Sequence, residues 1–377
     1  MPIILEKNST IAKSLINEGV DVISKEDAVH QDIREMHIGI LNLMPDAALR
    51  VTECQFIKLI ASCNKIIQIR IHIFTLNEIE RSNETKKYID ISYETFDQVR
   101  KDGLDALIIT GAPPFNEDIL SEVYSESLAK VISWGLKNVT SIWVSCLSAQ
   151  YVAKKNLNID RKKMNRKLWG VFPHTICDST HPLVKNMNSK FNCIHSRIYD
   201  VDETELQRHG FKTLIKCDVN QQFLLAVSPD GIKTILCQGH PEYDTISLFK
   251  EYKREINQYL KGIRLDYPPL PIAYFGKETE QTLNKYKKFL QQDDCTLNSA
   301  DFLEDYFSHS EIYNTWIDTS KALFGNWIGL VYHMTGYERN DPGIKGKMAI
   351  APTLATNFLL FKNIDKTISY NMVEKLG

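Results

Sequence analysis

The sequence predicts an α/β fold, a mostly parallel sheet with helices on both faces. Two observations lead to this prediction. Short apolar runs rich in Ile and Val alternate with stretches of helical periodicity, which is typical of buried strands joined by helices. Several runs also end in small or chemically active residues, as expected where the strands of an open parallel sheet meet a ligand crevice.

The apolar runs and periodic stretches give each element in turn. The predicted strands are 37–43, 66–74, 105–110, 141–145 and 233–237, and the predicted helices are 47–63, 119–136, 247–260 and 316–334. Strand 66–74 alternates cleanly, with isoleucines on one face, which indicates the edge of the sheet. Shorter runs and more turns from 172 to 230 predict an inserted β-rich segment.

Composition excludes several classes of function. The chain has 377 residues, of which 43% are apolar and 24% charged, as in a globular protein. Its net charge of −2 supplies no overall basic field for nucleic acid or membrane surfaces. No stretch approaches the ~20 apolar residues of a membrane span, and the start of the chain does not resemble a signal peptide. We therefore expect a cytoplasmic protein that binds small molecules, with no nucleic-acid or membrane partner.

The cysteines form no recognisable framework. None of the eight belongs to a C-x-x-C pair, which argues against a zinc ribbon or a thioredoxin motif. A reducing cytosol also argues against a disulfide framework, so most are expected to be small apolar fillers. They are Cys54, Cys63, Cys146, Cys177, Cys193, Cys217, Cys237 and Cys295.

Cys146 differs from the others because it ends a predicted strand just where helical periodicity begins. A residue at such a turn is exposed above the helix amino terminus, where the helix dipole favours a thiolate. The backbone N–H of Leu147 is then the first donor for an oxyanion. The small neighbours that the turn needs are present: Ser145, Ser148 and Ala149. The alternative is one more buried thiol, and only an available base favours a nucleophile instead.

The stretch Q-G-H-P-E at 238–242 supplies that base. His240 follows a predicted strand, and Glu242 lies close enough to fix its tautomer and stabilise the imidazolium. Taken alone, H-P-E is a weak signal, because a turn with a solvated glutamate is common. A cysteine turn followed later by His-x-Glu is the order used by glutamine-amidotransferase-like folds.

Other candidate sites are weaker. His174, His181 and His195 have neither the helical spacing nor the cysteine company of a structural metal site, so we expect polar surface or hydrogen-bonded residues and no metal. Gly103 and Gly111 flank a strand without forming G-x-G-x-x-G, which argues against a dinucleotide site.

The chain resembles the homoserine O-acyltransferases, the succinyl- and acetyltransferases of methionine biosynthesis with a class I glutamine-amidotransferase-like (flavodoxin-like) fold. The resemblance covers roughly residues 35 to 335, and its G-H-P-E-Y-D and L-N-L-M-P stretches are specific. The matching stretches, in family order, are L-N-L-M-P (41–45), I-T-G-A-P (109–113), Cys146 with A-Q (149–150), K-L-W-G-V-F-P-H (167–174), H-S-R (195–197), G-H-P-E-Y-D (239–244), E-Y-K-R-E (251–255) and L-F-G-N-W (323–327).

The resemblance implies a ping-pong acyl transfer. The cysteine would take the acyl group from acyl-CoA as a thioester and pass it to the hydroxyl of an amino acid. Acyl-CoA would be a co-substrate, with no bound cofactor. The implied catalytic residues are Cys146, His240 and Glu242, and the implied substrate-binding residues are Lys167, Ser196 and Arg254. Arg254 could grip the carboxylate of the amino acid bidentately, although without the resemblance it would be taken as a solvated cation on its helix.

Four positions depart from the family pattern. Leu147 and Ser148 follow the cysteine where relatives have Trp and then Gly or Ala, and Trp169 stands where some relatives carry a smaller residue. Phe115 occupies the position associated with acyl choice, typically Gly for succinyl users and Glu for acetyl users. Because a phenyl ring supplies neither the space nor the charge for succinate, the sequence favours acetyl over succinyl.

The same resemblance suggests how the chain is organised. We expect an N-terminal arm (1–34), a glutamine-amidotransferase-like acyltransferase domain (35–262), a helical C-terminal part of the same catalytic unit (263–335) and an extension without an assigned role (336–377). The family also implies a homodimer.

Three functions remain open on the sequence. The first is an O-acyltransferase for homoserine or a relative such as serine. The second is a glutaminase or amidotransferase subunit with the same triad, although no synthetase domain is present. The third is a binding protein on a decayed scaffold, which the joint presence of the triad and Lys167, Ser196 and Arg254 disfavours.

Overall fold

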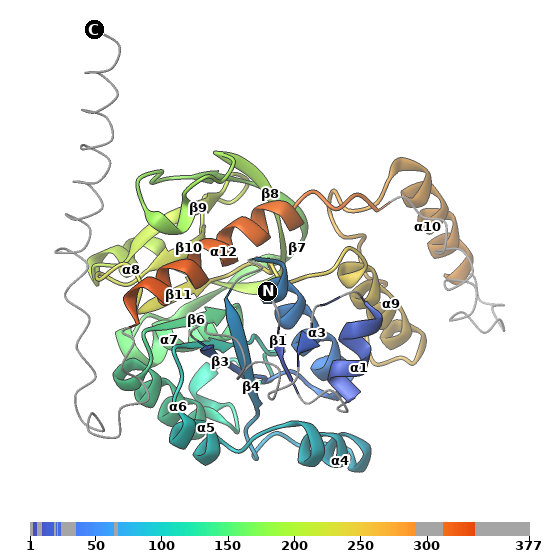
Figure 1. The fold of residues 1–377 in the computed structure, drawn as a ribbon. Helices are drawn as coiled ribbons and strands as arrows, with labels where there is room; N and C mark the ends of the chain where they lie inside the picture. The colour runs from blue at the N-terminus through green and yellow to red at the C-terminus, as the bar shows by residue number, and fades with distance from the viewer. Residues whose placement is uncertain are drawn as a thin grey trace, which may run out of the picture.

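The strands of the structure, a computed structural model, form one continuous sheet (Figure 1). The model describes residues 3–5, 10–18, 20, 22–23, 35–63, 67–291 and 312–335. The strands are β1 (Ile3–Ile4), β2 (Val22–Ile23), β3 (Glu35–Leu41), β4 (Gln68–Phe74), β5 (Ala106–Ile109), β6 (Ser141–Ser145), β7 (Arg161–Ile176), β8 (Lys190–Val201), β9 (Lys212–Cys217), β10 (Phe223–Val227) and β11 (Thr234–Cys237). Their order in the sheet is β2-β1-β4-β3-β5-β6-β11-β10-β9-β7-β8.

Helices cover both faces of this sheet. They are α1 (Thr10–Asn17), α3 (Asp46–Cys63), α4 (Asn83–Ser92), α5 (Phe96–Asp102), α6 (Ser125–Asn138), α7 (Leu147–Leu157), α8 (Glu203–Arg208), α9 (Ser247–Leu260), α10 (Lys277–Leu290) and α12 (Ile317–Met334). Alternate residues of β5 enter different cores, because successive side chains of a strand point to opposite faces. Ile108 packs with the α3 and α12 side, whereas Leu107 packs with the α6 and α7 side. The predicted α/β fold is confirmed.

The parallel part of the sheet runs from β2 to β11, and the remaining strands are antiparallel. The predicted β-rich segment therefore exists, but it extends the main sheet beyond β11. It also begins with β7 at Arg161, earlier than predicted. The prediction missed the start of this strand because its first half is mainly polar and contains no buried residue.

The prediction that strand 66–74 is a sheet edge was wrong. β4 lies between β1 and β3, with Ile3 opposite Ile69 on one side and Met36 opposite the same residue on the other. Its alternation does not mark a solvent face, because the polar positions Gln68 and His72 are buried as well. The residues of the predicted N-terminal arm that the structure describes add β1 and β2 to the sheet and pack α1 against it.

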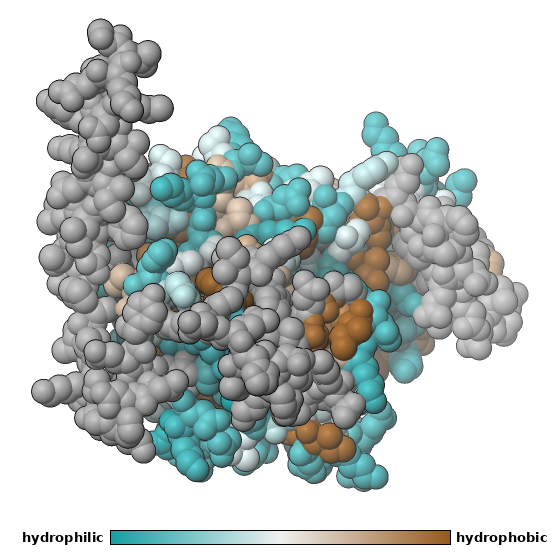
Figure 2. All heavy atoms as spheres, in the orientation of Figure 1, coloured by the Kyte–Doolittle hydropathy of each residue, from teal (hydrophilic) through white to brown (hydrophobic). Residues whose placement is uncertain are grey.

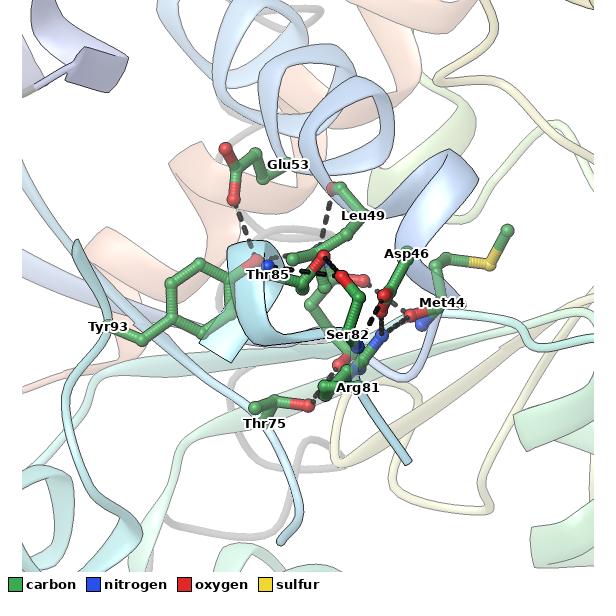
Figure 3. A network of polar contacts seen from close by, with 10 residues as sticks. Met44, Asp46, Leu49, Glu53, Thr75, Arg81, Ser82, Thr85 and Tyr93 are labelled. Atoms are coloured by element: carbon green, nitrogen blue, oxygen red, sulfur yellow. Dashed lines mark hydrogen bonds and ion pairs between the residues drawn. The ribbon is translucent and has the colours of Figure 1, made fainter. Parts of the chain in front are cut away.

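Polar contacts fix the turn between β3 and α3, where the L-N-L-M-P stretch lies (Figure 3). Arg81 donates to the carbonyl of Met44 at 2.6 Å and to Asp46 at 3.3 Å, and the N–H of Ser82 donates to Asp46 at 2.8 Å. Two turns further along α3, Glu53 accepts hydrogen bonds from Tyr93, at 2.6 Å, and from Tyr88. Burial raises the pKa of Glu53 to about 7. These bonds hold the carboxyl end of β3 in place.

The last predicted helix is present as α12, which contacts α3. The extension 336–377 lies outside the described residues, as does 292–311. No helix in the described part of the chain is long and apolar enough to cross a membrane. The face shown in Figure 2 is mainly hydrophilic wherever it is coloured, with small separate hydrophobic patches.

Candidate active site

Cys146 occupies the sharp turn that the sequence predicted. It links β6 to α7 with φ 48° and ψ −110°. Residues other than glycine rarely adopt this backbone conformation, and those that do are concentrated at functional sites. Its backbone N–H donates to the carbonyl of Cys237 at 2.7 Å, so the pairing of β6 with β11 continues up to the thiol. The turn thus holds the sulfur at the carboxyl edge of the sheet.

Neighbouring strand ends are tied to this turn. The hydroxyl of Ser148 donates to the carbonyl of Thr110 at 2.6 Å, and the N–H of Leu43 donates to the hydroxyl of Thr110 at 2.9 Å. A methyl group on Gly111 would lie 3.2 Å from Cβ of Cys146 and 3.9 Å from the nitrogen of Leu147. Glycine therefore keeps the space beside the thiol and the predicted oxyanion donor open.

His240 and Glu242 form the expected pair. Nδ1 of His240 lies 2.8 Å from Oε1 of Glu242, and both side chains are buried. Burial alone would lower the pKa of His240, but the carboxylate of Glu242 and a hydrogen bond with the Cys146 side chain raise it well above its ordinary value. The arrangement favours an imidazolium beside the sulfur, which is the charge that stabilises a thiolate.

Two other buried thiols lie in surroundings that disfavour a thiolate. Burial raises the pKa of Cys193 to about 12 and that of Cys237 well above its ordinary range. All the cysteines that the structure describes are free, as predicted, and these two behave as apolar fillers.

The structure joins Lys167 and Ser196 through a residue that the sequence reasoning missed. Glu251 on α9 accepts hydrogen bonds from Tyr243 at 2.6 Å, from Ser196 at 2.7 Å and from Nε1 of Trp169 at 2.9 Å. Nζ of Lys167 lies 3.8 Å from the same carboxylate. This carboxylate is nearly enclosed, yet burial is outweighed by Lys167 and these hydrogen bonds, which lower its pKa.

Tyr243 connects this cluster to the pair of His240 and Glu242. Its ring stacks on His240 with centroids 4.3 Å apart, while its hydroxyl reaches Glu251. Both Tyr243 and Glu251 lie inside stretches that carry the family resemblance, G-H-P-E-Y-D and E-Y-K-R-E. That membership was the available signal, but only the fold shows that the two side chains meet.

Lys167 is held from several sides. Its Nζ lies 2.7 Å from Glu255 and 4.1 Å from the ring centroid of Trp169, whose side chain is buried. Trp169 therefore supports the lysine and Glu251 at once.

Among the described residues, Arg254 and Phe115 share no hydrogen bond or ion pair with this cluster. Arg254 is exposed and lines a groove on the outer side of α9 with Lys250 and Lys253. Phe115 has 72% of its surface exposed, while its backbone N–H donates to Glu122 at 3.0 Å. The argument for acetyl required this ring to fill the acyl pocket, and a ring so exposed does not support it.

Of the two alternatives for the minor histidines, polar surface or hydrogen-bonded residues, the structure supports the second, since His174, His181 and His195 are all buried and hydrogen-bonded. His174 lies 2.9 Å from the carbonyl of Phe172, which can only accept, and its other nitrogen lies 2.8 Å from His195. Nδ1 of His195 faces Arg197, which can only donate. These partners fix one tautomer for each neutral ring.

This chain of hydrogen bonds also bears on metal binding. His174, His195 and Cys217 present ligand atoms within 4.8 Å of one another. However, the fixed tautomers leave neither imidazole with an unused lone pair, and the guanidinium of Arg197 repels a cation. Burial lowers the pKa of His174 to about 4 and that of His195 well below its ordinary value, so both rings are neutral at physiological pH.

Comparisons with known proteins agree with the site. The family model described as "Homoserine O-succinyltransferase" matches residues 2–337. A protein of that name from Allochromatium vinosum is 41% identical over 92% of this chain and 97% of its own length. Another, from Methylobacter tundripaludum, is 41% identical over 92% of this chain and 98% of its own. The chain therefore belongs to the homoserine O-succinyltransferase family, a family of O-acyltransferases.

Proposed function

We propose that this protein transfers a succinyl group from succinyl-CoA to the side-chain hydroxyl of homoserine through a thioester on Cys146. The observation that carries the proposal is the triad: a cysteine at a strained strand-to-helix turn beside His240, whose ring is fixed by Glu242. The names of the similar proteins supply the acceptor and favour succinyl over acetyl and homoserine over serine.

The first half of the reaction makes the acyl-enzyme. The sulfur of Cys146 attacks the thioester carbonyl, and its proton resides on His240. The N–H of Leu147 at the start of α7 is the proposed donor to the tetrahedral oxyanion. When the intermediate collapses, the carbon–sulfur bond to CoA breaks and the CoA thiolate leaves with the proton from His240.

The second half repeats these steps with the amino acid. His240 takes the proton of the acceptor hydroxyl as its oxygen attacks the acyl-cysteine, and the thiolate of Cys146 leaves. Lys167 and Ser196, both held at Glu251, are the proposed contacts to the amino acid. Arg254 stays a candidate for its carboxylate, because it follows Glu251 by three residues and so adjoins it on the helix surface.

The thioester tests the proposal directly. Intact mass spectrometry after mixing with succinyl-CoA, without acceptor, should show one added succinyl group, and homoserine should remove it. Cys146→Ser should abolish the adduct, whereas Cys177→Ser, which changes an exposed thiol, should keep it.

Other donors and substrates distinguish the alternatives. An adduct with acetyl-CoA but not with succinyl-CoA would mean that the enzyme transfers acetyl instead of succinyl. No adduct with either donor, together with ammonia release from glutamine, would favour the glutaminase alternative and overturn the proposal. Light scattering would test the homodimer that the family resemblance implies.

A further inference from the structure

A groove of about 720 Å³ is lined mainly by residues of α9, a helix at the periphery of the molecule (Figure 1). Its volume falls in the range of about 300 to 1,000 Å³ that is usual for ligand sites. None of the triad residues lines it. The lining residues are Ile246, Phe249, Lys250, Lys253, Arg254, Asn257, Gln258, Lys261, Ile263 and Ile312.

Every charged residue that lines the groove is a cation. Lys250, Arg254 and Lys261 form no ion pair with any residue that the structure describes. The neighbouring side of the same helix is the opposite in character. There, Glu251 and Glu255 are compensated by Lys167 and Arg264. The helix therefore separates acidic groups, satisfied within the protein, from basic groups left facing outward.

The basic and polar residues form a stripe along α9. Lys250, Arg254, Asn257 and Lys261 follow one another at helical spacing, so they share one side of the helix. The stripe is about 16 Å long at 1.5 Å per residue. Such a row suits a ligand with several separated negative charges, whereas a single small anion would need only one of them.

Apolar side chains border the same groove. Ile246 and Ile263 have 45% and 72% of their surface exposed. Exposed apolar surface beside a row of cations fits a ligand that combines phosphates with a flat ring. A nucleotide has this combination.

The groove adjoins the catalytic cluster. Arg254 follows Glu251 by three residues, and Ile246 stands six residues after His240, at the amino end of α9. A ligand in the groove would thus lie along the helix that carries Glu251, which accepts a hydrogen bond from Tyr243, the residue whose ring stacks on His240. This is the layout needed by a long donor whose reactive group lies far from its charges.

Resting on the function proposed above, we propose that this groove binds the phosphate-bearing nucleotide end of the acyl-CoA donor. Lys250 and Lys261 contact its phosphates, and Ile246 and Ile263 lie against the pantetheine arm or the adenine. CoA carries a 3′-phosphate and a 5′-pyrophosphate on one adenosine, which matches a row of cations with apolar borders. The groove sets affinity for the donor and takes no part in the bond-making steps.

Steady-state kinetics with matched donors test this proposal. We expect Lys250→Gln and Lys261→Gln each to raise KM for succinyl-CoA about two- to fivefold, as for exposed ion pairs, with kcat unchanged. The double variant Lys250→Glu, Lys261→Glu should raise this KM more than roughly tenfold and make it depend less on salt concentration. Lys130→Glu, the same charge reversal on an exposed lysine of α6, is the control and should leave KM unchanged.

A donor without phosphates separates the groove from the chemistry. Succinyl-pantetheine should acylate wild type and the lysine variants equally, and 3′-dephospho-succinyl-CoA should fall between the two donors. If the double variant uses succinyl-CoA with an unchanged KM while Cys146 is still acylated, the groove proposal is wrong and the proposed function stands. If neither succinyl-CoA nor succinyl-pantetheine acylates Cys146, the proposed function fails first.

Discussion

At the scale of single residues, the environment of His240 decides the reactivity of Cys146. Burial is the largest single influence on its pKa and lowers it, but the carboxylate of Glu242 and the contact with Cys146 together raise the pKa well above its ordinary value. A raised pKa keeps the imidazolium beside the sulfur over a wide pH range. An imidazolium is the charged neighbour that favours nucleophilic attack by a sulfur.

Glu242→Gln should lower the pKa of His240 and reduce the rate of Cys146 alkylation by iodoacetamide at pH 8 by roughly tenfold or more. Because less imidazolium remains at that pH, less thiolate is stabilised. Glu203→Gln changes another buried glutamate, on α8, and should leave the alkylation rate as in wild type. Equal rates in all three proteins would contradict the assigned role of Glu242.

Tyr243 offers two separable contacts. Tyr243→Phe keeps the ring stacked on His240 and removes the hydroxyl that reaches Glu251, so we expect a modest loss in kcat/KM, about two- to tenfold. Tyr243→Ala also removes the stack and should cost more, mainly in kcat. If Tyr243→Phe lost more kcat/KM than Tyr243→Ala, the stacked ring would not position His240.

At the scale of elements, the turn between β6 and α7 depends on a close approach by the end of β5. Gly111→Ala would place a methyl group 3.2 Å from Cβ of Cys146, tighter than ordinary contact. We expect the rate of acyl-enzyme formation, measured by stopped-time mass spectrometry, to fall at least roughly tenfold.

Gly329→Ala is the matched control for this change. An added methyl group at Gly329 meets no atom within 4 Å, and the residue lies inside α12. Because alanine is the better helix former, this variant should gain about 0.5–1 kcal/mol in unfolding free energy and keep wild-type activity. Equal activity for both glycine variants would mean that the space beside Cys146 is not used.

At the scale of the whole molecule, the buried histidines make stability depend on pH. Burial lowers the pKa of His174 to about 4, against about 6.5 when unfolded. Between these values the unfolded chain takes up a proton that the folded chain does not. The contribution is therefore fully present above pH 6.5 and is lost as pH falls towards 4, by up to about 3 kcal/mol.

Urea unfolding at several pH values measures this effect. The fall in unfolding free energy from pH 6.5 to 4.5 should be smaller in His174→Gln than in wild type. His209→Gln removes an exposed histidine and should follow the wild-type curve. Glu53, with a pKa raised to about 7, acts in the opposite direction, so the difference between variants is the relevant quantity. Parallel curves for His174→Gln and wild type would contradict the buried neutral pair.

The sequence by itself determined the α/β class, the main strands and helices, and which residues would meet at the strand ends: Cys146, His240 and Glu242. These features are local, because periodicity reports which side of an element is apolar and a triad at strand ends is recognisable from residue type and order. Its errors came from sequence patterns that fit more than one structure. The alternating pattern of β4 belongs to a strand buried on both faces, and the polar start of β7 belongs to a strand open to solvent.

Only the tertiary structure decided which distant side chains meet. Glu251 accepts hydrogen bonds from Ser196 and Tyr243 because β8, α9 and the loop after β11 converge. No local sequence pattern predicts that these three segments come together. The same packing turned Arg254 and Lys250 outward into one groove and enclosed His174 with His195. Burial, ring stacking and pKa depend on what surrounds a group in space, so they became visible only when the chain was folded.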